Sequence, residues 1–228
     1  IEIKKAMLSK KLIYAIGYNR SSAPWTKFIK SKINFEKTNI SMTINAGELP
    51  ADHWLLDKNS CGGRILGECC HFIDLALTLL SHTKLNHVEC VKRDKYYQDT
   101  GSFILTFDDG SKVDINYRHD LPASVPKEKI IVKLSQSNYS NYNWKKFSNG
   151  KIFNFSSPKK GKGHDEAISS FLCDVNNNNF STEGEIDHIC FSTYVAIKLQ
   201  KMSKGDILKD ILDCYRNETS SEFLKLND

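Results

Sequence analysis

Hydrophobic and polar positions change their period several times along the chain. Residues 1–11 have a helix-compatible composition, and the apolar run LIYAIG at 12–17 ends in glycine, which predicts a helix followed by a buried strand. A helix is predicted over 24–32, and alternating apolar and polar residues over 39–47 predict a half-buried strand. Between residues 67 and 80, apolar residues recur at helical spacing and mark one buried face: Phe72, Leu75, Ala76 and Leu79.

The middle of the chain follows the period of a strand. The segments HVECVKRD, SFILTFDDG, KVDINYRHD and KIIVKLSQ are separated by turn signals and predict antiparallel or mixed strands. Residues 138–163 add one or two strands, including KIFNF, before helical spacing returns at 164–175 and 185–204, on either side of a turn at 176–179. The pattern predicts an α+β fold, within the wider α/β class, with a largely antiparallel open sheet backed by helices.

The composition of the chain limits the cellular compartments and partners that we expect. No apolar run approaches the roughly 18 residues of a membrane span, and the first residues have no signal-peptide core, so we expect a cytoplasmic protein without a membrane partner. The seven cysteines lack repeating spacings, which favours reduced thiols. The net charge of +5 comes from basic and acidic residues interspersed along the chain, so it does not indicate a particular binding partner. Because the chain starts with Ile1, we expect it to begin inside a longer protein.

The segment CGGRILGECCHFID carries the strongest candidate chemistry. Its glycines permit a tight backbone just before a helix, and His71 then lies in the first turns of that helix. Glu68 shares a face with His71, and Asp74 stands where it could orient the imidazole. A histidine with a pKa of about 6.5 can accept a hydroxyl proton. His71 could equally be a structural residue, and Glu68 a first-turn acid favoured by the helix dipole.

Several motifs, in order along the chain, resemble the Gfo/Idh/MocA family of oxidoreductases, which includes glucose-fructose oxidoreductase and inositol dehydrogenase. GYNRSSAP at 17–24 is similar to the family's GYNRRFSP, and INAGELPADHW at 44–54 resembles a strand and loop of one branch. GGRILGECCHFIDL at 62–75 closely matches GGRIIGEVCHFIDL in that branch. GKGHDEAISSF at 161–171 resembles the helix start KGHREELEAF, and 189–204 resembles the final helix.

The resemblance implies a two-domain enzyme. Residues 1–19 would be the last helix and strand of a Rossmann domain, and 20–228 the C-terminal domain for substrate binding and oligomerisation. Family members move a hydride between a hydroxyl-bearing carbon of a sugar, sugar nucleotide or cyclitol and NAD or NADP, and the histidine matched by His71 handles the proton. The resemblance therefore implies a dehydrogenase that forms a homo-oligomer through its sheet, with its cofactor bound mainly by a part that would precede Ile1.

Two departures leave a second interpretation open. The chain has no Glu-Lys-Pro, which supplies the family's catalytic lysine, and Gly67 stands where many members have an aspartate, beside Glu68 as a possible substitute. GKGHDE at 161–166 has Glu166 where a dinucleotide fingerprint needs its third glycine. We therefore expect this chain alone to bind the cofactor poorly. The alternative is a catalytically silent binding or oligomerisation module derived from the family.

Further site candidates fall in three places. Three residues follow the expected last Rossmann strand: Tyr18, Asn19 and Arg20. They would either line the substrate cleft or pack the two domains together. Arg20 would also contact the cofactor. A group in the 44–54 segment suits a polyol by hydrogen bonding and stacking, although its tryptophan would also serve as a core anchor: Asn45, Asp52, His53 and Trp54. His164 begins a helix that would reach the same cleft.

Two other functions are disfavoured. Cys61, Cys69, Cys70 and His71 lack the paired spacing of structural zinc sites, so we predict no metal. The lysines and phenylalanines between residues 144 and 162 would suit nucleic acid, but strand alternation with solvated lysines explains them, so we predict no nucleic-acid partner.

Overall fold

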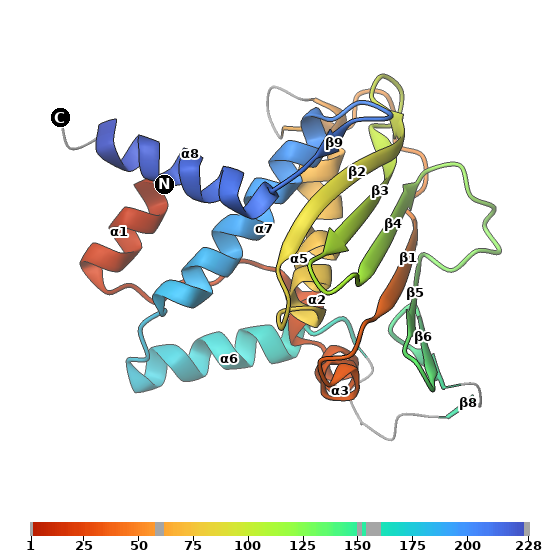
Figure 1. The fold of residues 1–228 in the computed structure, drawn as a ribbon. Helices are drawn as coiled ribbons and strands as arrows, with labels where there is room; N and C mark the ends of the chain where they lie inside the picture. The colour runs from red at the N-terminus through yellow and green to blue at the C-terminus, as the bar shows by residue number, and fades with distance from the viewer. Residues whose placement is uncertain (1, 58–61, 150–151, 154–160, 226–228) are drawn as a thin grey trace.

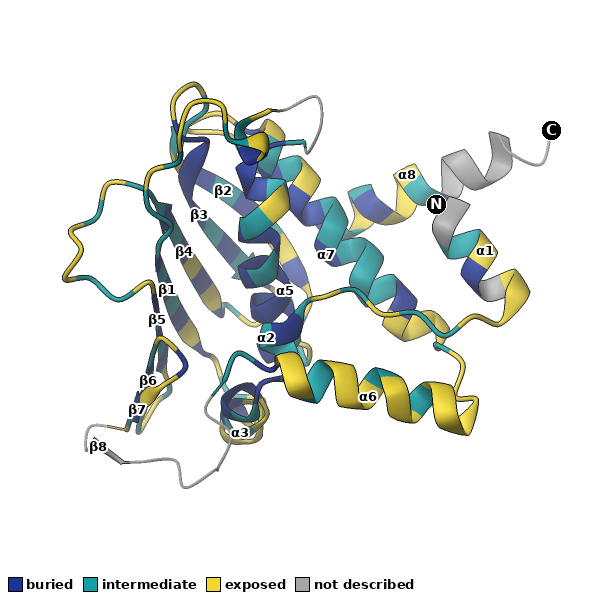
Figure 2. Cartoon of the chain, turned by 180° about the vertical axis from the view of Figure 1, so that it is seen from behind, coloured by how far each residue is buried: buried dark blue, intermediate teal, exposed yellow. Residues whose placement is uncertain are grey.

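The computed structural model describes residues 2–57, 62–149, 152–153 and 161–225. One open sheet forms a layer of the molecule, and helices cover one of its faces while the other stays bare (Figure 1, Figure 2). Its strand order is β8-β7-β6-β5-β1-β4-β3-β2-β9. Strand β1 runs parallel to β4, and the other pairs are antiparallel. The predicted fold class is confirmed.

The helices are α1 (Glu2–Lys10), α2 (Asn19–Ser22), α3 (Pro24–Ile33), α5 (Cys70–Leu79), α6 (His164–Asn177), α7 (Glu183–Lys201) and α8 (Ile211–Lys225), with a 3-10 turn η1 (Trp54–Leu56) and a π-turn η2 (Ile65–Cys69). The strands are β1 (Asn39–Asn45), β2 (Leu85–Asp94), β3 (Thr100–Phe107), β4 (Lys112–Arg118), β5 (Glu128–Lys133), β6 (Asn138–Tyr142), β7 (Lys146–Ser148), β8 (Ile152–Phe153) and β9 (Ile207–Leu208).

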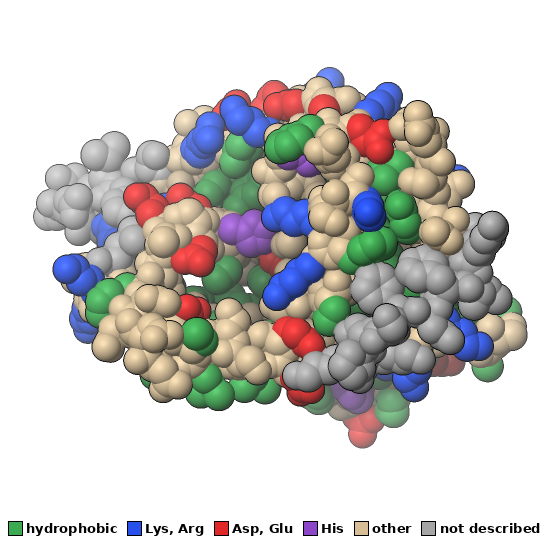
Figure 3. Space-filling view, turned by 90° about the horizontal axis from the view of Figure 1, so that it is seen from below, with side chains coloured by type: hydrophobic (Ala, Val, Ile, Leu, Met, Phe, Trp, Pro, Cys, Tyr) green, Lys and Arg blue, Asp and Glu red, His purple; other side chains and the backbone are tan. Residues whose placement is uncertain are grey.

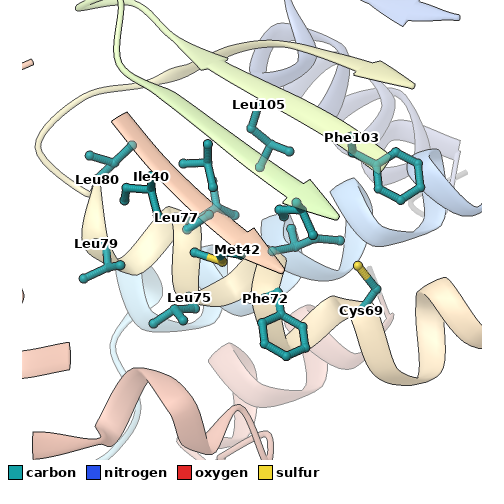
Figure 4. Close-up of a cluster of buried hydrophobic side chains, with 14 of the residues drawn as sticks. Ile40, Met42, Cys69, Phe72, Leu75, Leu77, Leu79, Leu80, Phe103 and Leu105 are labelled. Carbon is teal, nitrogen blue, oxygen red and sulfur yellow. The ribbon is translucent and has the colours of Figure 1, made fainter. Parts of the chain in front are cut away.

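The core lies between the sheet and helix α5 (Figure 4). Strand β1 presents Ile40, Met42 and Ile44 to it, each at most 3% exposed, as the alternation predicts. Helix α5 contributes the predicted buried face, joined by side chains from β3: Phe72, Leu75, Ala76, Leu79, Phe103 and Leu105. Burying each large apolar side chain contributes about 1.5–3 kcal/mol. This packing fixes α5, the helix that carries His71, against the sheet.

The apolar run at 12–17 is not a strand, contrary to the prediction. Residues 12–18 are irregular, and no described strand pairs with them. Their backbone is held instead by Ser181, whose Oγ accepts from the amide of Tyr14 at 2.9 Å and whose amide donates to the carbonyl of Leu12 at 3.2 Å. A strand needs a neighbouring strand for its backbone hydrogen bonds, and an apolar pattern alone does not provide one.

The helix predicted to start at Gly67 begins earlier, in the single π-turn that runs directly into α5. Gly62 and Gly63 precede it with positive φ values of 78° and 103°. A Cβ on Gly63 would lie 2.6 Å from Asp99 Oδ2, so this position requires glycine. The close approach expected of the glycine pair is therefore present.

A membrane-crossing segment would show as a long apolar helix. None of the described helices combines the length and the apolar character that crossing a bilayer requires.

Candidate functional site

His71 lies in the first turn of α5, immediately after the π-turn. Its ring meets Tyr18 edge to face, with centroids 5.7 Å apart. Its Nδ1 is buried and has no hydrogen-bond partner among the described residues. Burial, and then the positive charge of Arg20, lower the pKa of His71 to about 4. The imidazole is therefore neutral at physiological pH, and its unpaired Nδ1 is enclosed by the protein.

Asp74 does not orient His71 by a hydrogen bond, contrary to expectation. Its Oδ1 accepts from His188 Nε2 at 3.0 Å and from Ser192 Oγ at 3.1 Å, and its Oδ2 accepts from Ser21. The carboxylate therefore ties α5 to α2 and α7. Its charge reaches the imidazole only as a minor influence on the pKa.

A buried charge cluster lies beside His71, around Glu128 at the start of β5. Arg20 donates to it from Nε at 3.0 Å and from Nη2 at 2.9 Å, and Trp144 Nε1 donates at 2.6 Å. Lys162 donates to the same carboxylate, and the Arg20 guanidinium lies 4.6 Å from the ring centroid of Phe72. Burial alone would raise the pKa of Glu128, but these partners, Arg20 first, lower it to about 2.

A close backbone contact places Lys162 in this cluster. Asn19 is buried, and its Nδ2 donates to the carbonyl of Lys162 at 2.8 Å. Gly163 follows with a φ of 87°, and a Cβ there would lie 2.6 Å from the amide nitrogen of Ala23. Asn19 therefore packs the end of this loop onto α2. His164 comes next, exposed at the start of α6.

Glu68 is the partner of a buried arginine. Arg64 is fully buried and donates from Nε to Glu68 Oε2 at 2.8 Å, and the Tyr117 hydroxyl donates to the same oxygen. Arg64 also donates to the carbonyl of Ala46 at 2.9 Å. An isolated buried guanidinium is costly, so Glu68 acts in the structure as its counter-ion. This role is more specific than the helix-dipole effect considered from the sequence.

The other sequence candidates lie at the end of β1 and beyond. Asn45 Nδ2 donates to two carbonyls of the loop after β4, at 3.1 and 3.4 Å. His53 Nδ1 accepts from the amide two residues on, at 3.2 Å, and begins the η1 turn. Trp54 is 62% exposed, so it is not a core anchor, and Asp52 is exposed as well. Within the described ranges no hydrogen bond or ring contact joins these four residues to His71.

Tyr18, Arg20 and His71 are therefore brought together, and sequence reasoning missed the groups that hold them. Glu128 opens a strand, and Lys162 stands in a lysine-rich stretch, so neither carries a distinctive spacing. Arg64 lies inside the GGR motif itself, and its position there was the signal available in the sequence. Figure 3 shows the face on which α3 and α6 lie, where basic side chains stand beside a histidine at the margin of a hollow.

The described residues offer little support for a metal site or for nucleic-acid binding. Within those ranges, no three His, Cys, Asp or Glu side chains gather as a metal site would require. Cys69 and Cys70 are buried in the core, and Cys61 lies outside the described residues. In the lysine-rich stretch, Trp144 and Phe147 are buried and cannot stack on bases. Its remaining residues include some outside the described ranges: Lys151, Phe155, Lys159 and Lys160.

Comparison with known proteins gives structural matches. No protein-family model and no curated protein sequence matches the chain. GenD2 from gentamicin A biosynthesis, solved with NAD, superposes with a TM-score of 0.67 at 15% identity over 91% of this chain and 66% of its own. An inositol dehydrogenase homolog from Azotobacter vinelandii, solved with NAD+, gives 0.65 at 10% identity over 91% and 68%. A super-repressor mutant of Gal80p from Saccharomyces cerevisiae gives 0.67 at 14% identity over 91% and 67%.

These matches share one architecture, of which this chain spans about two thirds of the length. The open sheet backed on one face by helices is the part of those proteins that the chain reproduces. The chain therefore has the fold of the Gfo/Idh/MocA-type oxidoreductases, in the form of their C-terminal dehydrogenase domain.

Proposed function

We propose that this chain is the substrate-binding part of an NAD- or NADP-dependent dehydrogenase that acts on a hydroxyl of a sugar, sugar nucleotide or cyclitol. The observation that carries the proposal is the imidazole of His71, which is neutral and is flanked by Tyr18 and Arg20. A neutral imidazole can accept the proton of a hydroxyl bound beside it as the hydride leaves the carbon, and a pKa of about 4 makes this imidazole a weaker base than a free one. General-base catalysis of this kind typically contributes about 10²–10⁴-fold to the rate.

The groups around His71 position its ring and adjust its pKa. Tyr18 packs against the imidazole ring, and its hydroxyl lies 3.1 Å from Thr193 Oγ1, which fixes the tyrosine against α7. Burial first, and then the charge of Arg20, lower the pKa of His71 and keep it unprotonated. Glu68, tied to Arg64, holds the π-turn before His71 to strand β4 through Tyr117. In this proposal Glu68 supports the helix start and does not exchange the proton.

The described residues do not fit a dinucleotide. The GKGHDE segment, the nearest approach to a phosphate-binding turn, opens α6 with Gly163 packed against the backbone of Ala23. A pyrophosphate would need the space that this contact fills. Arg20, the one residue assigned to the cofactor from the sequence, binds Glu128 through two of its donors, and the donors that remain suit a single anionic group and not a whole dinucleotide. We therefore assign cofactor binding to a part of the protein other than these residues.

The experiment is a substrate panel on the full gene product. Polyols, sugars and sugar nucleotides are mixed with NAD+ or NADP+, and formation of the reduced nicotinamide is followed by its absorbance. At least one substrate is turned over, and His71→Asn lowers kcat by about 100-fold or more. His87→Asn, a control on the surface of β2, leaves kcat unchanged. Equal turnover by the His71 variant would show that another group handles the proton.

The bare face of the sheet suits a second copy of the chain, as the family resemblance implies. Along β3 and β5 the partly exposed side of the sheet carries Ile104 and Ile131, between buried neighbours. We propose that this face is the homo-oligomer interface. Light scattering after gel filtration tests this proposal, and we expect Ile104→Lys to convert the oligomer to a monomer. An unchanged mass would place the interface elsewhere.

A catalytically silent module is the second candidate. Gly67 in place of an aspartate and the commitment of Glu68 to Arg64 favour it, and Gal80p, solved as a super-repressor mutant, has the same fold. This candidate predicts that the full gene product oligomerises but neither binds a nicotinamide cofactor nor turns over any member of the panel. Cofactor binding measured by fluorescence therefore separates the two proposals.

A further inference from the structure

The cluster around Glu128 is one negative charge short. Its carboxylate is 3% exposed and receives both Arg20 and Lys162. The described hydrogen bonds add no second carboxylate to either cation, and Trp144, the remaining partner of Glu128, is uncharged. Counting only the groups hydrogen-bonded to Glu128, the cluster carries a net charge of about +1; the buried carboxylate of Asp74, which also acts on Cys70 and His71, is held by Ser21, His188 and Ser192. Such a surplus attracts an anion more strongly than a solvated surface lysine does.

Both cations keep donors to spare. A guanidinium has five N–H donors, and Glu128 takes one from Nε and one from Nη2 of Arg20. Arg20 Nη1 has no hydrogen bond to a described residue, and the Arg20 side chain is 12% exposed. Lys162 has a side chain 32% exposed and uses one donor on Glu128. Spare donors on two fixed cations match an oxyanion.

These donors lie near the proposed proton acceptor. The Arg20 guanidinium stacks on Phe72, the residue next to His71, and its charge lowers the pKa of His71. Lys162 belongs to a distant part of the chain, and the close contact of Gly163 with Ala23 holds it there. One region thus joins a neutral imidazole to an anchored positive pair.

We propose that Arg20 and Lys162 form a subsite for an anionic group of the substrate, a carboxylate or a phosphate, while a hydroxyl of the same substrate faces His71. This inference rests on the proposed function and narrows its substrate class to acidic sugars and polyols. Fixed by Glu128, the two cations bind the oxyanion without first losing side-chain entropy, and the anion orients the hydroxyl.

The test compares three probes of similar size on the chain of 228 residues. Titration calorimetry at low salt measures the dissociation constants of D-glucuronate, glucose 6-phosphate and glucose. The carboxylate and phosphate arms identify which anion is preferred, and glucose reports the neutral baseline. At least one anionic probe binds about tenfold or more tightly than glucose, and added salt weakens this preference. Lys162→Met abolishes the preference, whereas Lys145→Met, which removes an exposed lysine after β6, retains it.

Three results would overturn the inference: equal affinity for all probes, no binding of any probe, or the same loss of preference in the two lysine variants. The last would show that overall charge is responsible. Circular dichroism confirms that the variants fold. If the full gene product oxidises neutral polyols through His71 while the anionic probes show no preference, the subsite is wrong and the proposed function stands. If the anionic probes bind preferentially but replacing His71 leaves turnover unchanged, the anion subsite stands and the proposed role of His71 is wrong.

Discussion

Replacing Glu128 with glutamine tests the charge cluster beside His71. The substitution keeps the shape of the side chain but removes the charge that Arg20 and Lys162 share. In the folded chain the pKa of Glu128 falls from 4.5 to about 2. Each tenfold change in acid strength corresponds to about 1.4 kcal/mol, so the ionised form contributes about 3 kcal/mol near pH 7. We expect Glu128→Gln to lower the free energy of unfolding by about this amount.

The pH dependence provides a second signature. Because the folded pKa of Glu128 is depressed, its stabilisation is fully present above the unfolded value of about 4.5 and is lost as the pH falls toward about 2. The difference in unfolding free energy between wild type and Glu128→Gln therefore shrinks by about 2 kcal/mol between pH 7 and pH 3.

Urea unfolding followed by tryptophan fluorescence measures both effects, since Trp144 touches the carboxylate. Asp52→Asn is the control, because Asp52 is exposed and has no ion pair among the described residues. A loss below about 1 kcal/mol for Glu128→Gln, typical of exposed pairs, would refute the description of a buried cluster. So would a loss that stays constant between the two pH values.

Three further predictions concern the same region. NMR titration of the chain gives His71 a pKa of about 4, and a value near 6.5 would mean that the imidazole is neither buried nor influenced by Arg20. Gly163→Ala lowers the free energy of unfolding by at least about 1 kcal/mol in a denaturant titration, because its Cβ would collide with backbone, whereas Gly161→Ala, with open space, leaves it unchanged. Glu68→Gln removes the counter-ion of buried Arg64, and because the Glu68 carboxylate is 40% exposed, we expect a loss of about 1 kcal/mol in thermal or urea unfolding; an unaltered stability would exclude the structural role.

Periodicity predicted the sheet and most helices because those segments bury one face. The alternation over 39–47 predicted the buried side of β1, and helical spacing predicted the buried face of α5. Residues 138–163 form three strands, β6, β7 and β8, where one or two were expected, because their pattern is too short and polar to show a period. Short elements such as α2 and η1 were not predicted, and two others at the C-terminal end were missed as well. Strand β9 has two residues, too few to show a period, and α8 follows a sequence dominated by polar residues. The prediction of a strand at 12–17 was wrong because the apolar pattern is present there but no neighbouring strand is available to pair with it among the described residues.

The site was predicted in part. The glycine pair and the helix start predicted that His71 lies in the first turn of a helix, because the steric limits on the backbone are local and can be inferred from the sequence. Its surroundings depend on long-range contacts: Glu128 is 108 residues from Arg20, and Tyr117 is 49 from Glu68. Asp74 shows the limit of local reasoning, because its partner His188 comes from another helix 114 residues away. Pairing between distant charges leaves no periodic trace in a single sequence.

The role of His71 as proton acceptor is the central claim, and chemical rescue tests it most directly. In the full gene product, turnover of the best substrate by His71→Ala is compared with wild type, with and without added imidazole. We predict a loss of about 100-fold or more that imidazole partly restores, because the free base can enter the space left by the side chain. Turnover by His71→Ala at the wild-type rate without imidazole would contradict the account.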